Sequence, residues 1–418
     1  MVEKVQAGEK LPKGWKWFSL GKICEFRNGI NFTSSQKGRG LLTVDVLNMY
    51  SDSLHISMAD LYRVDVSSKN ENLLQKNDIL FVRSSVKQEG VGWATLFPGY
   101  SEQVSFCGFL IRARLTTKEI DPSFLIYYLR SDSVRNWIIS RSTRGTITNI
   151  SQDGLQALSI PVPPISEQKR IVGILNDRLT AIDKAHTATE TQLKAAKALP
   201  AAYLRQVFDS AEAQKWKIKR LGDVLEDIVA GKSLKCDERP ARLDEWGVLK
   251  VSAVSWGKFK PEQNKVLPEY FIPLSEHEVK AGDLLISRAN TTELVGAVVL
   301  VEEGTRSLLM LSDKTLRLIP TTQADKGYLE LALRERMARE YIEEHGTGTS
   351  DSMKNISQET IRNIPILLPP ISKQIEIAEA QGKRQPEIER VIQILQSQLN
   401  TINQLPAATL RQAFNGEL

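Results

Sequence analysis

Cysteine and histidine are scarce in this chain of 418 residues, which has three cysteines and four histidines. Cys24, Cys107 and Cys236 lie far apart and form no CxxC pair, which argues against a disulfide scaffold or a zinc module. The start of the sequence is polar, without the apolar core of a signal peptide, and no stretch approaches the roughly 18 apolar residues of a membrane span. We therefore expect a cytoplasmic protein that makes no contact with membrane.

A large excess of one charge is also missing, since 55 Lys and Arg stand against 50 Asp and Glu. The net charge of +5 allows a basic surface for nucleic acid but does not demand one. The 41% hydrophobic and 25% charged content is typical of soluble globular proteins, and the length suits two domains with separate cores.

Complete catalytic motifs are absent as well. Ala230-Gly-Lys-Ser resembles the end of a phosphate-binding loop, but Glu226 stands where that loop needs its first glycine. The Pro-Pro pairs after Val162 and Leu368 lack the polar and aromatic neighbours with which an amino-methyltransferase holds its target base. No HExxH or GxGxxG pattern occurs. We predict no catalytic residue, no metal site and no cofactor in this chain.

What the sequence does have is an internal repeat. Asn149-Ile-Ser-Gln recurs as Asn355-Ile-Ser-Gln, and Pro163-Pro-Ile-Ser recurs as Pro369-Pro-Ile-Ser, both 206 residues later. The ten residues from Leu199 recur from Leu405 at the same offset, with eight identities. The front of each half matches more loosely, at offsets of 201 to 205. Each half therefore predicts a divergent domain followed by a closely matched tail.

The divergent parts have the composition of small α+β domains. Short β-favouring runs begin at Asp78, Phe109, Asp283, Val295 and Thr315. Asp121 and Pro122 predict the N-cap and first position of a helix, and residues 326–344 are interpreted as the equivalent helix of the second half.

The matched tails predict long helices that begin at the N-cap candidates Ser166 and Ser372. Apolar or small residues then follow a spacing of three and four, which is typical of a coiled-coil seam. About 33 residues up to Ala198 give a rod of about 50 Å. Pro200 and Pro406 are expected to kink or end the two rods, and Gly382 and Pro386 to add a kink in the second. The seam residues are Ile182, His186, Thr189, Leu193, Ile388, Ile392, Leu395, Leu399 and Ile402.

Two divergent domains alternating with two matched helical segments, together with Leu11-Pro-Lys-Gly-Trp and Pro163-Pro-Ile-Ser-Glu-Gln, resemble a known family. The chain resembles the DNA specificity subunit of type I restriction-modification systems over essentially its whole length. The resemblance implies an α+β fold with two homologous target recognition domains, separated by two long antiparallel coiled-coil helices in a pseudo-twofold repeat. The implied parts are residues 11–165 and 211–371 for the domains, and 166–210 and 372–418 for the helices.

The resemblance also implies partners. Each domain would bind one half of a bipartite double-stranded DNA site, and the helices would set the spacer and dock two methyltransferase subunits. Those subunits would bind S-adenosylmethionine and methylate adenine N6, while restriction and motor subunits would use ATP and Mg²⁺. The second tail has Lys373-Gln-Ile where the first has Glu167-Gln-Lys, so the second tail departs from the family's pattern there.

The candidate DNA-binding residues follow matching strands or precede the Asn-Ile-Ser segments, where arginine and asparagine can contact base edges and Gly/Thr-rich loops can contact phosphates. For Arg83 and Arg288, pairing with nearby carboxylates is the alternative; for the others it is ordinary surface exposure. The candidates are Arg83, Ser84, Lys87, Arg141, Arg144, Thr146, Arg288, Asn290, Thr347 and Thr349, with weaker ones at Lys37, Arg39, Lys232 and Lys235. A non-enzymatic structural adaptor and a stand-alone DNA-binding regulator are the alternative functions.

Overall fold

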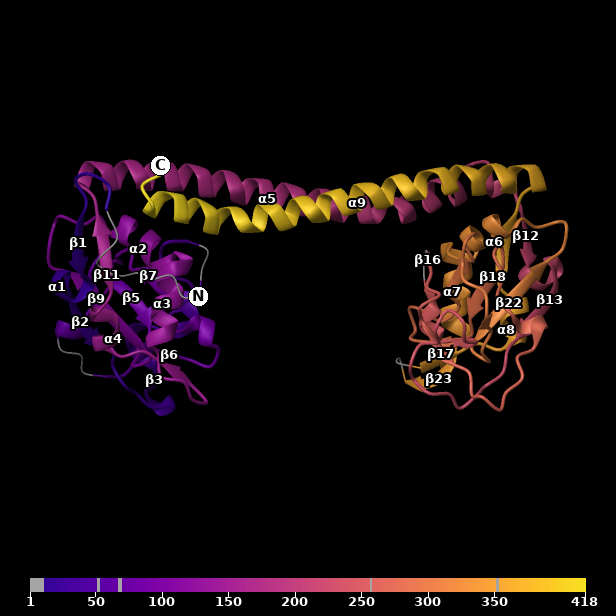
Figure 1. Cartoon of the computed structure of the whole chain (residues 1–418), viewed down its shortest axis with the longest axis horizontal. Coiled ribbons are helices and arrows are strands. Elements are labelled where there is room, and N and C mark those ends of the chain that lie inside the picture. Colours follow the sequence, from indigo (N-terminus) through magenta and orange to yellow (C-terminus); the bar gives the residue numbers. More distant parts are fainter. Residues whose placement is uncertain (1–10, 51–52, 67–69, 256–257, 351–352) are drawn as a thin grey trace. The chain divides into compact units, whose positions relative to one another are not determined.

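The structure is a computed structural model that describes residues 11–50, 53–66, 70–255, 258–350 and 353–418. The chain forms two compact units (Figure 1). Unit 1 comprises Met1–Thr191 and Gln396–Leu418, and unit 2 comprises Gln192–Leu395. Unit 1 is thus assembled from two segments that are far apart in the sequence.

Unit 1 contains two main sheets, in which short apolar runs form the buried strands. The antiparallel sheet has the order β2-β9-β5-β7, and a second sheet has the order β4-β3-β8 with β3 and β8 parallel. Two strand pairs, β1-β11 and β6-β10, complete it. The strands are β1 (Lys16–Ser19), β2 (Cys24–Asn28), β3 (Lys37–Val44), β4 (Tyr62–Val64), β5 (Ile79–Val82), β6 (Ser84–Ser85), β7 (Ala94–Leu96), β8 (Val104–Phe106), β9 (Leu110–Leu115), β10 (Thr148–Asn149) and β11 (Ser159–Val162).

Unit 2 repeats this topology. Its sheets have the orders β13-β22-β18-β20 and β17-β14-β21, again with a parallel pair, β14 and β21. The pair β12-β25, the pair β15-β16 and the sheet β19-β24-β23 accompany them. The strands are β12 (Lys217–Arg220), β13 (Leu225–Ala230), β14 (Gly247–Leu249), β15 (Val254–Ser255), β16 (Lys258–Phe259), β17 (Asn264–Val266), β18 (Leu284–Ser287), β19 (Ala289–Asn290), β20 (Val298–Leu300), β21 (Leu309–Met310), β22 (Thr315–Pro320), β23 (Thr347–Ser350), β24 (Met353–Asn355) and β25 (Pro365–Leu368).

Helices follow the strands in the same order in both units. Unit 1 contains α1 (Leu20–Ile23), α2 (Pro122–Arg130), α3 (Asp132–Arg141) and α4 (Gln152–Gln156), and unit 2 contains α6 (Lys326–Ala332), α7 (Arg336–His345) and α8 (Gln358–Arg362). The long helices α5 (Ile165–Phe208) and α9 (Ile371–Phe414) have 44 residues each and contribute to both units. None of the helices in these described residues is long and apolar enough to cross a membrane.

The strand predictions and the cap at Asp121 are confirmed. Strands β5, β9, β18, β20 and β22 lie within the predicted runs. The Asp121 carboxylate accepts hydrogen bonds from the backbone N–H groups of Ser123 and Phe124, at 2.9 and 3.1 Å, with Pro122 in the first turn.

The prediction of one helix over residues 326–344 is wrong. The segment forms α6 and α7, which are separated at Leu333–Glu335 just as α2 and α3 are separated at Ser131. Glu335 caps the new helix by accepting from the Met337 N–H at 2.7 Å. The Glu335 carboxylate, which lies within a segment of helix-favouring residues, therefore caps the start of a second helix.

The predicted N-cap positions are wrong by two residues. Helices α5 and α9 begin at Ile165 and Ile371, so Ser166 and Ser372 lie in the first turn and are not N-caps. The carbonyl of Pro164 accepts from the N–H groups of Glu167 and Gln168, at 2.8 and 3.0 Å. A proline can precede the first helical residue because only its carbonyl is needed there.

The internal prolines do not end the helices. Helix α5 runs through Pro200 to Phe208, and α9 runs through Gly382, Pro386 and Pro406 to Phe414. A proline removes one helical hydrogen bond, but Ala196 and Leu204 are buried on either side of Pro200. Packing on both sides of the proline holds the helix together.

In each unit the start of one long helix packs beside the end of the other, which makes the pair antiparallel (Figure 1). In unit 1, Ile171 and Leu175 of α5 cluster with Ala413 of α9. In unit 2, Leu204 and Phe208 of α5 share a core with Ile377 of α9. Each helix therefore stabilises both cores.

A buried glutamine fixes the start of each long helix. Gln168 is fully buried; its amide N–H donates to the carbonyls of Glu119 and Pro163, both at 2.8 Å, and its oxygen accepts from the Asp121 N–H at 2.7 Å. Gln374 makes the same three bonds in unit 2, to Gln323, Pro369 and Asp325. The Pro-Pro-Ile-Ser-x-Gln repeat is thus a structural joint that satisfies buried backbone groups.

Replacing Gln168 by Leu leaves the buried Pro163 carbonyl without its partner, at a cost of about 1–3 kcal/mol, and removes the partly buried bonds to the Glu119 carbonyl and the Asp121 N–H. We expect Gln168→Leu to lower the opening free energy of the α2 amides by at least about 2 kcal/mol, measured by hydrogen exchange, with unit 2 unchanged. The exposed Gln192→Leu on the same helix is the control. Equal losses in the two variants would contradict this role for Gln168.

Candidate nucleic-acid interface

The structure brings together the two groups of predicted DNA-binding residues within each unit. Strand β6, directly after Arg83, pairs with β10, and β19, directly after Arg288, pairs with β24. The Arg83 carbonyl accepts from the Ile150 N–H at 3.0 Å, and the Arg288 carbonyl accepts from the Ile356 N–H at 2.9 Å. The loop after the central strand and the segment before Asn-Ile-Ser therefore form one surface in each unit.

The Asn-Ile-Ser repeat itself is a structural element of this surface. Ile150 and Ile356 are buried in the two cores. Ser151 caps α4 by accepting from the Gly154 N–H at 3.0 Å, and Ser357 caps α8 by accepting from the Thr360 N–H at 2.9 Å. The segment holds the neighbouring loops in place by burying one side chain and capping one helix.

Most of the predicted residues of unit 1 on this surface are exposed. Arg83 is half-buried, and its guanidinium lies 3.4 Å from the Gly108 carbonyl. The Ser84 hydroxyl donates to the Asn149 side chain at 2.5 Å, across the β6-β10 pair. Arg141 stacks on the Trp137 ring at 5.3 Å. The exposed members are Lys87, Arg141, Arg144 and Thr146.

The corresponding residues of unit 2 are arranged similarly. Arg288 is exposed, and half-buried Asn290 accepts the Thr291 N–H with its own side chain at 2.9 Å. The Thr347 hydroxyl donates to the Asn355 carbonyl at 3.1 Å. Thr349 belongs to β23, and its side chain lies outside the described part of the structure. The salt bridges of the described residues include neither Arg83 nor Arg288, so the alternative of carboxylate pairing finds no support there.

The four weaker candidates make other contacts. The Lys37 ammonium lies over the Tyr62 ring at 4.2 Å, and Arg39 pairs with Asp65 at 2.7 Å. Lys232 forms a backbone bridge with Ser312, and Lys235 is exposed. These contacts place Lys37 and Arg39 on β3 and do not join them to the β6-β10 surface.

The seam residues all lie on α5 or α9, and each is at least half-buried. Thr189, Leu395 and Ile402 are fully buried, whereas His186 is half-buried with its Nδ1 3.6 Å from the Glu190 carboxylate. The half-buried members are Ile182, His186, Leu193, Ile388, Ile392 and Leu399.

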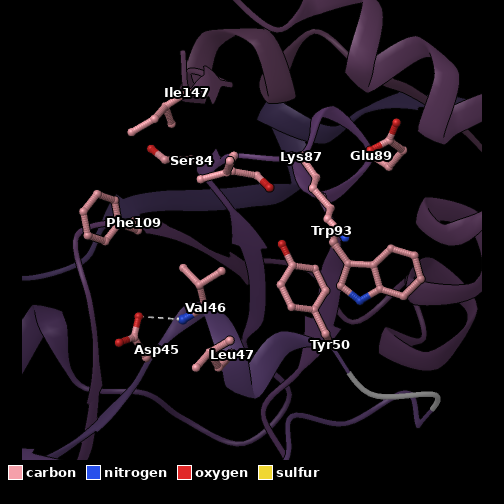
Figure 2. Close-up of a pocket in the computed structure, with 13 residues that line it drawn as sticks. Asp45, Val46, Leu47, Tyr50, Ser84, Lys87, Glu89, Trp93, Phe109 and Ile147 are labelled. Atoms are coloured by element: carbon pink, nitrogen blue, oxygen red, sulfur yellow. Dashed lines mark hydrogen bonds between the residues drawn. The ribbon is translucent and has the colours of Figure 1, made fainter. Parts of the chain in front are cut away.

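One feature of unit 1 was missed by the sequence predictions, namely an apolar hollow of about 910 Å³. Figure 2 shows Val46, Tyr50, Phe109 and Ile147 around this hollow, with Ser84 and Lys87 on its wall. Its residues come from four separate segments between Asp45 and Ile147, so no local pattern marks them. The available signal in the sequence was Val86, an apolar residue directly before the candidate Lys87.

Asp45 lines the hollow, but its oxygens already accept hydrogen bonds. It accepts from the Tyr62 hydroxyl at 2.6 Å, the Val46 N–H at 2.7 Å and the Cys107 thiol at 3.2 Å. Burial acts to raise the pKa of Asp45, but these hydrogen bonds outweigh it and lower the pKa below its ordinary value. The carboxylate is therefore a structural anion at neutral pH.

No cluster of three or more His, Cys, Asp or Glu side chains that could hold a metal ion occurs in the described residues. The chemistry available on the surfaces of both units is hydrogen bonding, charge and apolar contact. Such groups serve recognition of a ligand.

A family model described as the type I restriction modification DNA specificity domain matches this chain twice, over residues 12–196 and 213–403. The chain belongs to this family. The resemblance noted in the sequence is confirmed, and so is the fold of two tandem α+β domains with long helices. The two matches correspond to the two copies of the sheet order described above.

Several proteins of this type are similar to the chain. The EcoKI specificity subunit of Escherichia coli K12 is 26% identical over 428 residues, covering 98% of this chain and 90% of that protein. The EcoEI specificity subunit of Escherichia coli is 37% identical over 164 residues, which are 39% of this chain and 27% of that protein.

Solved structures show the same fold at low identity. The HsdS subunit of Thermoanaerobacter tengcongensis has a TM-score of 0.65 and 20% identity, covering 99% of this chain and all of that one. A chain from a structure on complex assembly and conformational transition of the type I R-M system has a TM-score of 0.71, at 20% identity and 98% coverage of this chain.

The role of Asn-Ile-Ser as a cap leads to a testable expectation. Ser151→Ala and Ser357→Ala should each lower the free energy of unfolding by about 1 kcal/mol, because an N-cap hydrogen bond is lost. Ser151→Asp, which retains an acceptor, is the control, and chemical denaturation measures the effect. A changed DNA target in Ser151→Ala at unchanged stability would show that the serine contacts DNA instead.

Proposed function

We propose that this chain is the subunit that gives a type I restriction-modification complex its DNA specificity. Unit 1 and unit 2 each bind one half of a bipartite double-stranded site. The observation that carries the proposal is one domain topology present twice, with matched joints and helix caps but different side chains on the corresponding loops. A scaffold that recognises two different half-sites needs this combination.

DNA contact in each unit is assigned to the surface formed by β6-β10 or β19-β24. Lys87, Arg141 and Arg144 are exposed there in unit 1, and Arg288 in unit 2. Cations of this kind bind phosphates, and arginine, serine and asparagine can also contact base edges in the major groove. The carboxamide of Gln88, in its hydrogen-bonding orientation, accepts from the Arg144 guanidinium at 3.1 Å, which positions that cation.

The long helices serve as spacer and docking surface. A helix held on both sides by buried residues keeps a fixed length, whereas a flexible linker samples many distances. We infer that α5 and α9 set the length of the spacer between the half-sites. Their remaining faces would dock two methyltransferase subunits, and restriction or motor subunits would join through these.

Catalysis belongs to the partner subunits, since the relatives are specificity subunits. S-adenosylmethionine would be bound by the methyltransferase subunits, which would methylate adenine N6, and ATP with Mg²⁺ by the motor subunits. The assembled complex would act on DNA in the cytoplasm of a prokaryotic cell.

Duplex binding at several salt concentrations tests this function. The chain, purified with its methyltransferase partners, should bind a duplex with its site more tightly than a scrambled duplex, with an affinity that falls steeply with salt. Arg144→Ala should weaken binding to both duplexes and reduce the slope of log K against log salt by about 1.

Lys118→Ala removes an exposed cation from the segment between β9 and α2 and is the matched control, expected to leave the slope unchanged. Equal, weak binding to site and scrambled duplexes would contradict the proposal and favour a structural adaptor. Tight specific binding by a chain that recruits no methyltransferase would favour a stand-alone regulator.

A further inference from the structure

The apolar hollow of unit 1 has an exposed rim. Leu47 is 84% exposed, Val86 82%, Phe109 57% and Ile147 45%. These side chains line a single concavity together with Tyr50 and Trp93 (Figure 2). Apolar groups gathered at one exposed site indicate a binding surface, because their exposure to water costs free energy that binding a ligand would recover.

The matching positions of unit 2 can be identified from the shared topology. The Arg83 N–H donates to the Phe109 carbonyl and the Arg288 N–H donates to the Lys314 carbonyl, both at 2.8 Å, so Lys314 is the counterpart of Phe109. Val86 and Thr291 are each the third residue after those arginines.

Leu47 has its counterpart in the same way. It is the second residue of the 3-10 helix Val46–Met49, which follows β3, and Ser252 is the second residue of Val251–Ala253, which follows β14. Strands β3 and β14 occupy the same place in their sheets. Ile147 corresponds to Met353, so of the four exposed rim positions this one is apolar in both units.

Three exposed apolar residues of unit 1 are therefore replaced by exposed polar ones, Ser252, Thr291 and Lys314, in unit 2. The fold does not require the apolar character, since unit 2 has the same topology without it. A protein subunit that bound both halves alike would need the same surface twice. Because this surface differs between the two units, we expect its ligand to differ as well. The two DNA half-sites are such ligands.

The charges bordering the hollow also suit DNA. The acidic residues lining it are Asp45, whose oxygens accept three hydrogen bonds, and exposed Glu89. Lys87 is the cation that lines the hollow, and Arg83, Arg141 and Arg144 lie on the adjoining segments. An apolar centre with a cationic border matches a base edge between two phosphate backbones.

We propose that the apolar hollow of unit 1 binds the 5-methyl groups of thymines in the major groove of its half-site, whereas the matching surface of unit 2 contacts base edges through hydrogen bonds. The proposal rests on the function proposed above. The thymine methyl is the apolar group that distinguishes one base edge from the others in the major groove. Leu47, Val86 and Phe109 would contact it, while Lys87 and Arg144 bind the adjacent phosphates.

Deoxyuridine provides a direct probe, because it pairs like thymidine and lacks only the methyl group. The complex of this chain with its methyltransferase subunits is titrated with duplexes in which each thymine of the mapped site is replaced singly by deoxyuridine. In one half-site, at least one replacement should weaken binding by about fourfold, the value for burying one methyl-sized group. In the other half-site, replacements should change binding by less than about twofold.

Variants assign the effect to unit 1. Val86→Thr introduces the residue found at the matching position of unit 2 and nearly preserves shape, and Val86 is so exposed that the fold is not at risk. It should remove the difference between thymine and uracil, and Phe109→Lys should do the same. Ile272→Thr, at an equally exposed position of unit 2, should leave the difference intact.

Three results would overturn the proposal while leaving DNA recognition in place. They are a unit 1 half-site without thymine, uracil replacements without effect in both halves, and a full uracil effect in Val86→Thr. Loss of the methyltransferase subunits from Val86→Thr or Phe109→Lys would instead make the hollow a protein-binding surface. Failure of the complex to prefer its site over a scrambled duplex would count against the proposed function itself.

Discussion

Phe208 and Phe414 close the cores of two different units from the far ends of two long helices. Phe414 packs edge-on against Phe124 and Tyr128, with ring centroids 5.4 and 5.1 Å apart. Phe208 packs edge-on against Trp216 and in a tilted arrangement against Tyr328, with centroids 6.2 and 6.0 Å apart. Because aromatic burial of this kind contributes strongly to stability, the last turn of each helix must stay in its core, which constrains the continuity of both helices.

The structural features that meet this constraint are the same in both halves, whereas other surface residues differ. The helix ends, the Gln168 and Gln374 joints and the caps at Ser151 and Ser357 recur with the same partners. They support the loops after Arg83 and Arg288 through internal hydrogen bonds. The residues beside these loops can then differ, with Phe109 before β9 in unit 1 and Lys314 before β22 in unit 2, while the supporting contacts stay the same.

The two long helices were largely predictable because the sequence repeat identifies them. A constant offset of 206 residues identified the two matched tails, and their apolar spacing identified the helices. Predictions from local sequence were less reliable where tertiary contacts determine the secondary structure. Pro200 should weaken a helix, yet buried Leu204 and Phe208 hold it. Glu335 split a predicted helix because its side chain caps a new start.

The candidate interface was only partly accessible from sequence. Arg83 and Arg144 could be proposed from strand ends and loop composition, and the structure joins their segments through β6 and β10. Phe109 could not, because it lies opposite Arg83 only once β5 and β9 pair, and an exposed aromatic residue has no local pattern. The residue types in the sequence predicted polar contacts to DNA. The proposed apolar contacts could be inferred only from the folded structure.

The central claim is that two domains of the same topology, joined by the long helices α5 and α9, carry two different DNA-binding surfaces. Mapping adenine methylation across the genome of a host that carries this chain and its methyltransferase partners tests it most directly. The account predicts a bipartite motif with two unlike half-sites, an unspecified spacer of fixed length and one modified adenine in each half. A continuous motif, two identical half-sites or a spacer of variable length would contradict it.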